Sequence, residues 1–222
     1  MGDNQMTTSE QITILKLTNI SKYFIPNKPV FQNISFSVNE GEIIAITGNN
    51  GSGKSTLLRI IAGLDQKYNG SIQYRNKAHL KPSTDIILLH QTYDQLFPWL
   101  TVEKNIIKPL RATTKLSFEH AKLIAHSKLL NVGIQNEYFN SYPYQLSGGQ
   151  KQKVALARAL ALNADILLMD EPFTALDEAS RSNFHIMLKS LAKLHKKTIL
   201  LVSHSSQEVD ALADNTICLN QK

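Results

Sequence analysis

The sequence has a single cysteine and no long apolar run. Cys218 has no second cysteine to pair with inside the chain, so nothing favours an oxidising compartment. No stretch approaches the roughly 18 unbroken apolar residues of a membrane span. The first ten residues also lack the basic start and apolar core of a signal peptide. We therefore expect a cytoplasmic chain, which can still dock onto a membrane protein.

Long blocks of charge are absent as well. The chain has 24 Lys and Arg against 18 Asp and Glu, a net charge of +6, spread along its length. This excess suits attraction to an anion, but the scattering favours an ordinary solvated surface. Basic residues interleaved with aromatics, which nucleic-acid binding would need, do not occur as a segment. We therefore expect no nucleic-acid partner.

Short apolar runs that alternate with helical patterns make up most of the 222 residues. The runs at 42–47, 86–90, 166–170 and 198–203 are nearly continuous, as in buried parallel strands. This order predicts one α/β domain, a mostly parallel sheet with helices on both faces. The alternating runs 12–17 and 33–38 predict an added N-terminal antiparallel β portion. Helices are expected near 54–63, 102–111, 117–131, 150–162, 178–194 and 205–213.

The middle of the chain, about 92–145, has no convincing buried strand. It contains at least two helical patterns, one of which runs from a candidate N-cap, Ser117, to a candidate terminal glycine, Gly133. We interpret this region as a helical insertion. The expected division is a core of 1–91 and 163–222 and a helical part of 92–162.

A glycine-rich stretch, "GNNGSGKST", lies between an apolar run and a helical pattern. It matches the P-loop pattern G-x-x-x-x-G-K-[ST], in which backbone N–H groups surround phosphate oxygens. Lys54 would reach the β- and γ-phosphates, and the Ser55 hydroxyl would bind Mg²⁺. A plain glycine-rich turn does not explain so long a match in this context. The predicted nucleotide contacts are Gly48, Asn49, Asn50, Gly51, Ser52, Gly53, Lys54, Ser55 and Thr56.

Two acids end the apolar run at 166–170. Asp170 would hold Mg²⁺ through water, and Glu171 would polarise an attacking water. The alternative is a pair of surface acids at a strand end. A kinase needs no second carboxylate, because its nucleophile is its substrate, and no Asn-Lys-x-Asp segment of the GTPase type is present. The pair therefore favours ATP hydrolysis.

A second glycine pair occurs in "LSGGQ", residues 146–150. Like the P-loop it combines a hydroxyl residue, Ser147, with glycines ahead of a helical pattern. It has no lysine and no metal-binding serine in the P-loop positions, and no strand directly before it. This loop is therefore not a complete nucleotide site by itself.

Together these three motifs, in their order along the chain, resemble those of ABC-transporter ATPases, over about 12–219. "LSGGQ" is the family signature and the most specific element, and "ALD" at 175–177 matches the family's D-loop. The resemblance implies a P-loop NTPase fold. It also implies a role for three single residues. Gln91 matches the family's Q-loop glutamine and His204 matches its switch histidine. Phe24 matches the aromatic residue that stacks on adenine, with Tyr23 as the alternative.

Each implied residue also has a plainer reading. Gln91 would place an amide near Mg²⁺ or the attacking water, or be a solvated loop residue. His204 follows a strand at the end of the sheet where ligands bind, and would donate to the γ-phosphate; a lone histidine is otherwise structural. Asp177 would contact nucleotide, or simply be a helix N-cap.

The resemblance further implies pairs of subunits. Each ATP would lie between the 48–56 loop of one subunit and the 146–150 loop of another, which is a second copy or a paralogous subunit. The implied contacts of the second loop are Ser147, Gly148, Gly149 and Gln150. Thr92 and Ser205 stand where the family commonly has acids, but neither change removes a catalytic group.

The segment "QLFPWLTVEKNI", 95–106, resembles the nitrate, sulfonate and taurine importer branch. There this region contacts the transmembrane permease subunit, so Phe97–Trp99 would be the docking patch; alternatively, Trp99 anchors the core of the helical part. The expected function is an ATPase that powers solute import from the inner face of the cell membrane. The alternatives are an exporter ATPase and a non-transport ABC ATPase that acts on nucleic acid or the ribosome.

Overall fold

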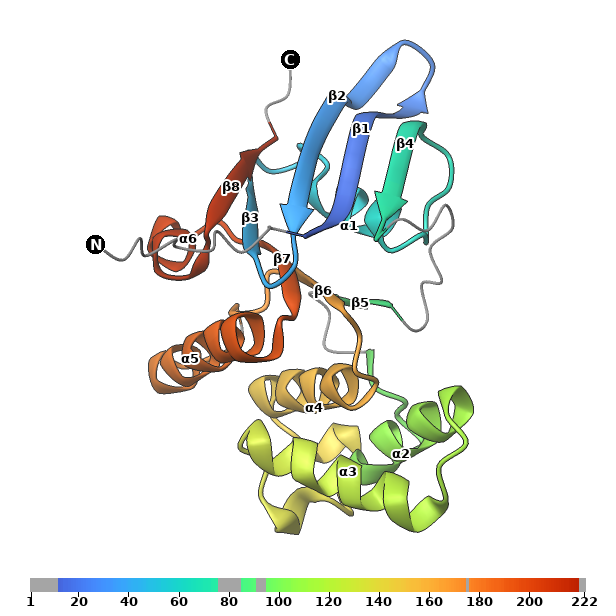
Figure 1. The fold of residues 1–222 in the computed structure, drawn as a ribbon. Helices are drawn as coiled ribbons and strands as arrows, with labels where there is room; N and C mark the ends of the chain where they lie inside the picture. Colours follow the sequence, from blue (N-terminus) through green and yellow to red (C-terminus); the bar gives the residue numbers. More distant parts are fainter. Residues whose placement is uncertain (1–11, 76–84, 91–94, 175, 220–222) are drawn as a thin grey trace, which may run out of the picture.

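The computed structural model describes residues 12–75, 85–90, 95–174 and 176–219, which form two sheets and a group of helices (Figure 1). The N-terminal sheet is antiparallel, with β1 in its centre. Its strands are β1 (Thr13–Ile25), β2 (Lys28–Asn39) and β4 (Asn69–Tyr74). The predicted antiparallel portion is therefore confirmed, and its first two strands are about twice as long as expected because they form one continuous hairpin.

The second sheet has five strands in the order β5-β6-β7-β3-β8, and every neighbouring pair is parallel. Its strands are β3 (Ile43–Thr47), β5 (Ile86–Leu89), β6 (Ile166–Asp170), β7 (Thr198–Val202) and β8 (Asn215–Cys218). All four strands predicted from continuous apolar runs are present. In β6 and β7 every residue is buried, which explains why their sequences do not alternate.

The two faces of the parallel sheet carry different layers. In β3, Ile43 and Ala45 join the core on the side of the helices, whereas Ile44 and Ile46 join the core beneath the antiparallel sheet. This separation follows from the two-residue period of a strand. The fold therefore has helices on both faces, as predicted, but one of those faces is shared between a helix and the antiparallel sheet.

Six α-helices are present in the described ranges. Helix α1 (Lys54–Ile61) packs under the antiparallel sheet, and the other helices lie on the opposite side (Figure 1). They are α2 (Val102–Thr113), α3 (Phe118–Asn131), α4 (Gly148–Ala161), α5 (Glu178–His195) and α6 (Ser206–Leu212), with short 3-10 turns η2 (Asn136–Tyr138) and η3 (Pro143–Gln145). Ser117 caps α3 as predicted.

Two strands were not predicted, β4 and β8. Most of their residues are exposed, and each lies at an edge of its sheet. Edge strands of this kind need no apolar run, so their sequences resemble loops. Within the described part of the chain, none of the helices is long and apolar enough to cross a bilayer.

Candidate functional site

The P-loop joins β3 to α1 and depends on Gly53. This residue has φ +93°, and a Cβ added to it would lie 2.6 Å from Val30 Cγ1 and 2.7 Å from Phe31 Cδ1. A larger residue would therefore push β2 away from the loop. Gly53 is also the N-cap of α1, and no side chain caps this helix end. The first N–H groups of α1 are consequently not used by a capping side chain.

Lys54 folds back across the P-loop. Its side chain is buried, and its Nζ donates hydrogen bonds to the carbonyl oxygens of Gly48 (2.9 Å) and Asn49 (3.0 Å). Both acceptors are neutral carbonyl oxygens, so these two bonds hold the side chain in the loop without pairing it with a carboxylate. A phosphate at this point would gain a charge-assisted hydrogen bond.

Asp170 meets the P-loop at the end of β6. Burial raises the pKa of its carboxyl, while a hydrogen bond with the Ser55 side chain and the charge of Lys54 oppose that rise. Two of the three groups predicted to bind Mg²⁺, those of Ser55 and Asp170, are thus adjacent. A buried carboxylate is stabilised by a cation, and hydroxyl and carboxylate oxygens are ligands that Mg²⁺ prefers, so the residues present fit the metal.

Glu171 and His204 contact each other directly. Glu171 Oε1 lies 3.1 Å from His204 Nε2. The backbone of Glu171 has φ +49°, a conformation that is costly for a non-glycine residue, and its N–H donates to the carbonyl of Val202 (3.2 Å). The side chains predicted to activate water and to donate to phosphate are therefore neighbours, although they lie 33 residues apart in the sequence.

A cavity of about 370 Å³ brings these groups together. Of the two aromatic candidates, Phe24 borders it, whereas the Tyr23 hydroxyl is engaged by the Gln32 side chain at 2.6 Å. The structure therefore favours Phe24. The lining residues are Phe24, Val30, Asn50, Gly51, Gly53, Lys54, Ser55, Thr56, Glu171 and His204, and nine of these ten are residues that the sequence predicted.

The signature residues do not line this cavity. Ser147 is the N-cap of α4: its hydroxyl accepts from the Gln150 N–H (3.2 Å), and the Gln150 side chain accepts from the Ser147 N–H (2.9 Å). Because of this capping box, α4 begins at Gly148, and both glycines lie inside its first turn rather than ahead of the helix. The second loop is therefore an exposed helix N-terminus.

Two further predicted residues stand apart. Asp177 caps α5, accepting hydrogen bonds from the Ser180 N–H and hydroxyl, both at 2.8 Å, and these bonds lower the pKa of its carboxyl. This geometry is that of a helix N-cap, the simpler of the two interpretations of Asp177. Gln91 lies outside the described residues.

The loop that carries His204 is held by a residue that sequence reasoning missed. Glu208 accepts a 2.5 Å hydrogen bond from the Ser203 hydroxyl, and the same hydroxyl accepts the N–H of Ser205 (3.0 Å). Both neighbours of His204 are therefore fixed. The spacing of Ser205 and Glu208, a hydroxyl residue followed three positions later by glutamate, is a helix-start signal that would have identified this support.

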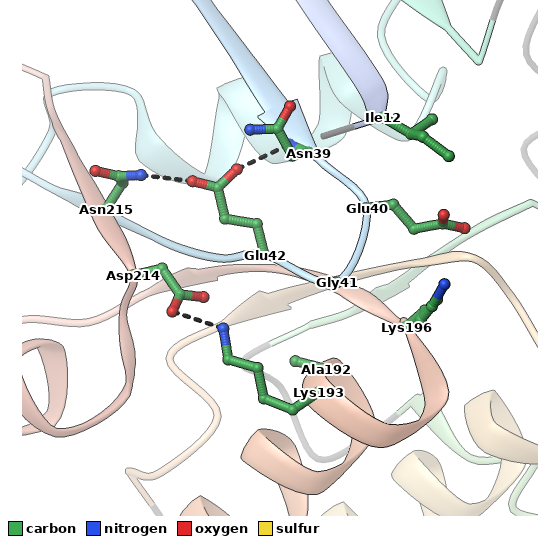
Figure 2. A pocket seen from close by; sticks show the side chains of 10 residues that line it. All are labelled: Ile12, Asn39, Glu40, Gly41, Glu42, Ala192, Lys193, Lys196, Asp214 and Asn215. Carbon is green, nitrogen blue, oxygen red and sulfur yellow. Dashed lines mark hydrogen bonds and ion pairs between the residues drawn. The ribbon is translucent and has the colours of Figure 1, made fainter. Parts of the chain in front are cut away.

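A larger cavity, of about 430 Å³, lies at the other end of the parallel strands (Figure 2). Lys193 pairs there with Asp214 at 2.8 Å, and Glu42 accepts hydrogen bonds from the Asn39 N–H and the Asn215 side chain. The charges of Lys193 and Asp214 are thus matched to each other, whereas Glu42 is held by neutral N–H donors. None of its lining residues belongs to the predicted site.

The Phe97–Trp99 segment is exposed. Trp99 is 69% exposed, so it is not an anchor of the core, and its ring lies 5.6 Å from that of Phe97. Buried Asn105 holds the segment by accepting from the Phe97 N–H (2.7 Å) and donating to the carbonyls of Phe97 and Leu100. An apolar pair is thus presented to solvent on a supported loop.

Comparison with known proteins agrees with this geometry. The family model described as "ABC transporter" matches residues 31–174. The chain is 36% identical over 219 residues to the bicarbonate transport ATP-binding protein CmpD of Synechocystis, covering 96% of this chain and 77% of that protein. It is 35% identical over 211 residues to the aliphatic sulfonates import ATP-binding protein SsuB of Bacillus cereus, covering 94% and 82%.

Among solved structures, the ATP-binding cassette MJ0796, captured as a dimer in a post-hydrolysis state with ADP and Pi, superimposes with a TM-score of 0.83. The two chains are 32% identical, and the match covers 93% of this chain and 94% of that one. Fold, motif order and sequence similarity thus agree over nearly the whole length. The chain belongs to the ABC transporter family and is an ATP-binding subunit that hydrolyses ATP.

Proposed function

We propose that this chain powers an importer and that it works as a pair, with each ATP held between the P-loop of one subunit and the 146–150 helix start of the other. One observation carries the proposal: the described lining of the cavity contains Phe24, the P-loop, Glu171 and His204, but nothing from 146–150. The signature is therefore left to complete a partner's site. The dimeric form of the MJ0796 cassette supports this arrangement.

Hydrolysis then follows from the pair at the cavity wall. Glu171 accepts a proton from the attacking water, and His204, 3.1 Å away, orients that carboxylate and donates toward the γ-phosphate. Mg²⁺ would be held by Ser55, Asp170 and Gln91, and when bound it neutralises phosphate charge. Asp177 would contact the partner's nucleotide from the D-loop.

The exposed Phe97–Trp99 pair is the proposed docking site for the permease, because aromatic side chains are favoured anchors at interfaces. Residues 92–162 are proposed as the helical subdomain that carries this patch, with the protein on the inner face of the membrane. The names of the two relatives concern bicarbonate and aliphatic sulfonates, both small anions. A small anionic solute is accordingly the proposed cargo.

The test is the Glu171→Gln variant. It is expected to bind ATP as the unaltered protein does, to lose turnover by about 10²–10⁴-fold, and to elute as a dimer when ATP is present. The matched control is Glu137→Gln, at an exposed position of η2, which should retain full turnover. Turnover that survives in Glu171→Gln would exclude Glu171 as the base, and a monomeric ATP complex would exclude the shared site.

A further inference from the structure

Lys22 is a buried lysine on β1, the strand that also carries Phe24. Its side chain is only 3% exposed, and its Nζ donates hydrogen bonds to Asp65 Oδ1 (2.8 Å) and to the carbonyl oxygen of Lys67 (2.7 Å). The same Nζ lies 5.0 Å from the centre of the Phe24 ring. The ammonium is therefore placed against the aromatic side chain that borders the nucleotide cavity.

The ring of Phe24 has two different environments. One face covers the ammonium of Lys22, and the side chain as a whole is still 68% exposed. Lys22 and Phe24 lie two residues apart on β1, where the pairing with β2 is irregular around Tyr23, and the two side chains meet there. A cation over an aromatic face is attracted by the ring, so this contact selects one orientation of an otherwise exposed side chain.

Lys22 also ties β1 to the P-loop helix. Asp65 and Lys67 belong to the segment that follows α1, whereas Lys54 of the P-loop begins that helix. The hydrogen bond from Lys22 lowers the pKa of the Asp65 carboxyl against the opposing effect of burial, so this carboxyl is ionised at neutral pH. The far end of α1 is thereby held to the strand that carries Phe24.

We propose that Lys22 is a positioning residue for base recognition: its ammonium holds the Phe24 ring in the stacking orientation and sets its distance from the P-loop. This inference rests on the proposed function, in which Phe24 stacks on adenine. Lys22 itself touches no nucleotide. Its effect should therefore appear with the whole nucleotide and be absent when only the phosphate chain is bound.

The size of the effect follows from preorganisation. Ordering one free side chain on binding costs about 0.5–1.5 kcal/mol, which corresponds to about a 2- to 12-fold change in affinity. Removing the cation should therefore raise the dissociation constant for ATP by about that factor. The turnover number at saturating ATP should change little, because the groups at the γ-phosphate are untouched.

The experiment compares Lys22→Met with Lys16→Met, which changes an exposed lysine on the same strand. Binding of ATP and of inorganic tripolyphosphate is measured by calorimetry, and steady-state hydrolysis gives KM and kcat. Lys22→Met is expected to weaken ATP binding and raise KM, with tripolyphosphate binding and kcat unchanged. Lys16→Met should match the unaltered protein, and Lys22→Arg should restore most of the ATP affinity.

Combination with Phe24→Ala separates this inference from the proposed function. In the Phe24→Ala background, Lys22→Met should have no further effect on ATP affinity. Equal weakening of ATP and tripolyphosphate binding, or full additivity with Phe24→Ala, would overturn the positioning role and leave the ATPase assignment intact. If Lys22→Met does not fold, Lys22→Gln, which keeps a donor for Asp65 but no charge, gives the same comparison. Unchanged ATP affinity in Phe24→Ala would instead remove the stacking assignment itself.

Discussion

Two helices of the described ranges, α1 and α4, have glycine at their N-terminal end, and these two ends are built in opposite ways. At α1 the N-cap is Gly53 in a left-handed conformation, and no side chain caps the helix. At α4 the N-cap is Ser147, which exchanges two hydrogen bonds with Gln150. The N-terminal N–H groups of α1 are therefore available to a ligand that binds in the cavity of the same subunit. The N-terminus of α4 is instead stabilised by its own capping box and lies outside that cavity.

The two ends share one property. Among the six α-helices of the described ranges, α2, α3, α5 and α6 each carry a glutamate in the first turn, whereas α1 and α4 carry no acidic residue there. A carboxylate at a helix N-terminus stabilises the helix but repels another anion. Both α1 and α4 lack that stabilisation. Only α1 has a buried lysine, Lys54, and oxygen groups suited to Mg²⁺ nearby, those of Ser55 and Asp170. This difference supports the proposal that the N-terminus of α1 binds phosphate and that the N-terminus of α4 completes the site of a partner subunit.

The largest expected effect comes from removing the cation that only the first end has. Lys54→Ala should weaken ATP binding by at least about 10²-fold and abolish hydrolysis, because hydrogen bonds to charged groups contribute about 1.5–3 kcal/mol each. Calorimetry and a phosphate-release assay measure both. Lys108→Ala, at an exposed position of α2, is the matched control and should change neither. Undiminished ATP affinity in Lys54→Ala would remove the distinction between the two helix ends.

The second helix end is tested by Ser147→Arg. The long cationic side chain would occupy the space that a partner's phosphate needs, so hydrolysis should fall by about 10²-fold, the loss seen when one preorganised donor is removed. ATP affinity of the monomer should stay normal, because the cavity does not include Ser147. Ser117→Arg removes the equivalent cap from α3 and controls for helix stability. Loss of monomer affinity would mean that the second end binds ATP within its own chain.

The sequence predicted the parts of the fold that are buried and periodic. The strands at 43–47, 86–89, 166–170 and 198–202 were found because they are apolar on both faces, whereas β8 was missed because it is an exposed edge. The P-loop and Glu171 could be predicted as site residues because their chemistry requires fixed residue types, and the structure brings both to one cavity. Lys22 and Glu208 could not, because a lysine on a strand and a glutamate on a helix are ordinary until their partners are known.

A smaller effect is expected on stability when the buried carboxyl beside the P-loop, Asp170, is replaced by asparagine. Burial raises the pKa of Asp170, so the folded state favours its protonated form; the stabilisation this brings is complete below the ordinary pKa of 3.8 and is lost as pH rises through the folded-state pKa. Asn cannot ionise, so without nucleotide Asp170→Asn should have the higher Tm at pH 7, with a gap that shrinks toward pH 4.

Thermal unfolding at a series of pH values measures that gap, with about 2–4 °C expected for each 1 kcal/mol in a chain of this size. Asp177→Asn is the control with the opposite sign. The pKa of Asp177 is lowered by its bonds to Ser180, so its contribution is present at neutral pH and is lost as the solution becomes acidic. A gap for Asp170→Asn that widens toward acid pH would contradict a raised pKa at this position.

The smallest effect compares the glycines of the two helix starts. Gly149 lies inside the first turn of α4, where alanine is up to about 1 kcal/mol more favourable than glycine, so Gly149→Ala should raise Tm slightly. Gly53→Ala should lower Tm, because φ is +93° and the new methyl group would collide with Val30 and Phe31. Hydrolysis should fall in both variants, since a Cβ at either end narrows the space for phosphate. Stability and activity therefore move together at Gly53 and in opposite directions at Gly149. A Gly149→Ala variant that is more stable and fully active would show that the signature glycine leaves no space that a phosphate uses, and the two helix ends would no longer be halves of one site.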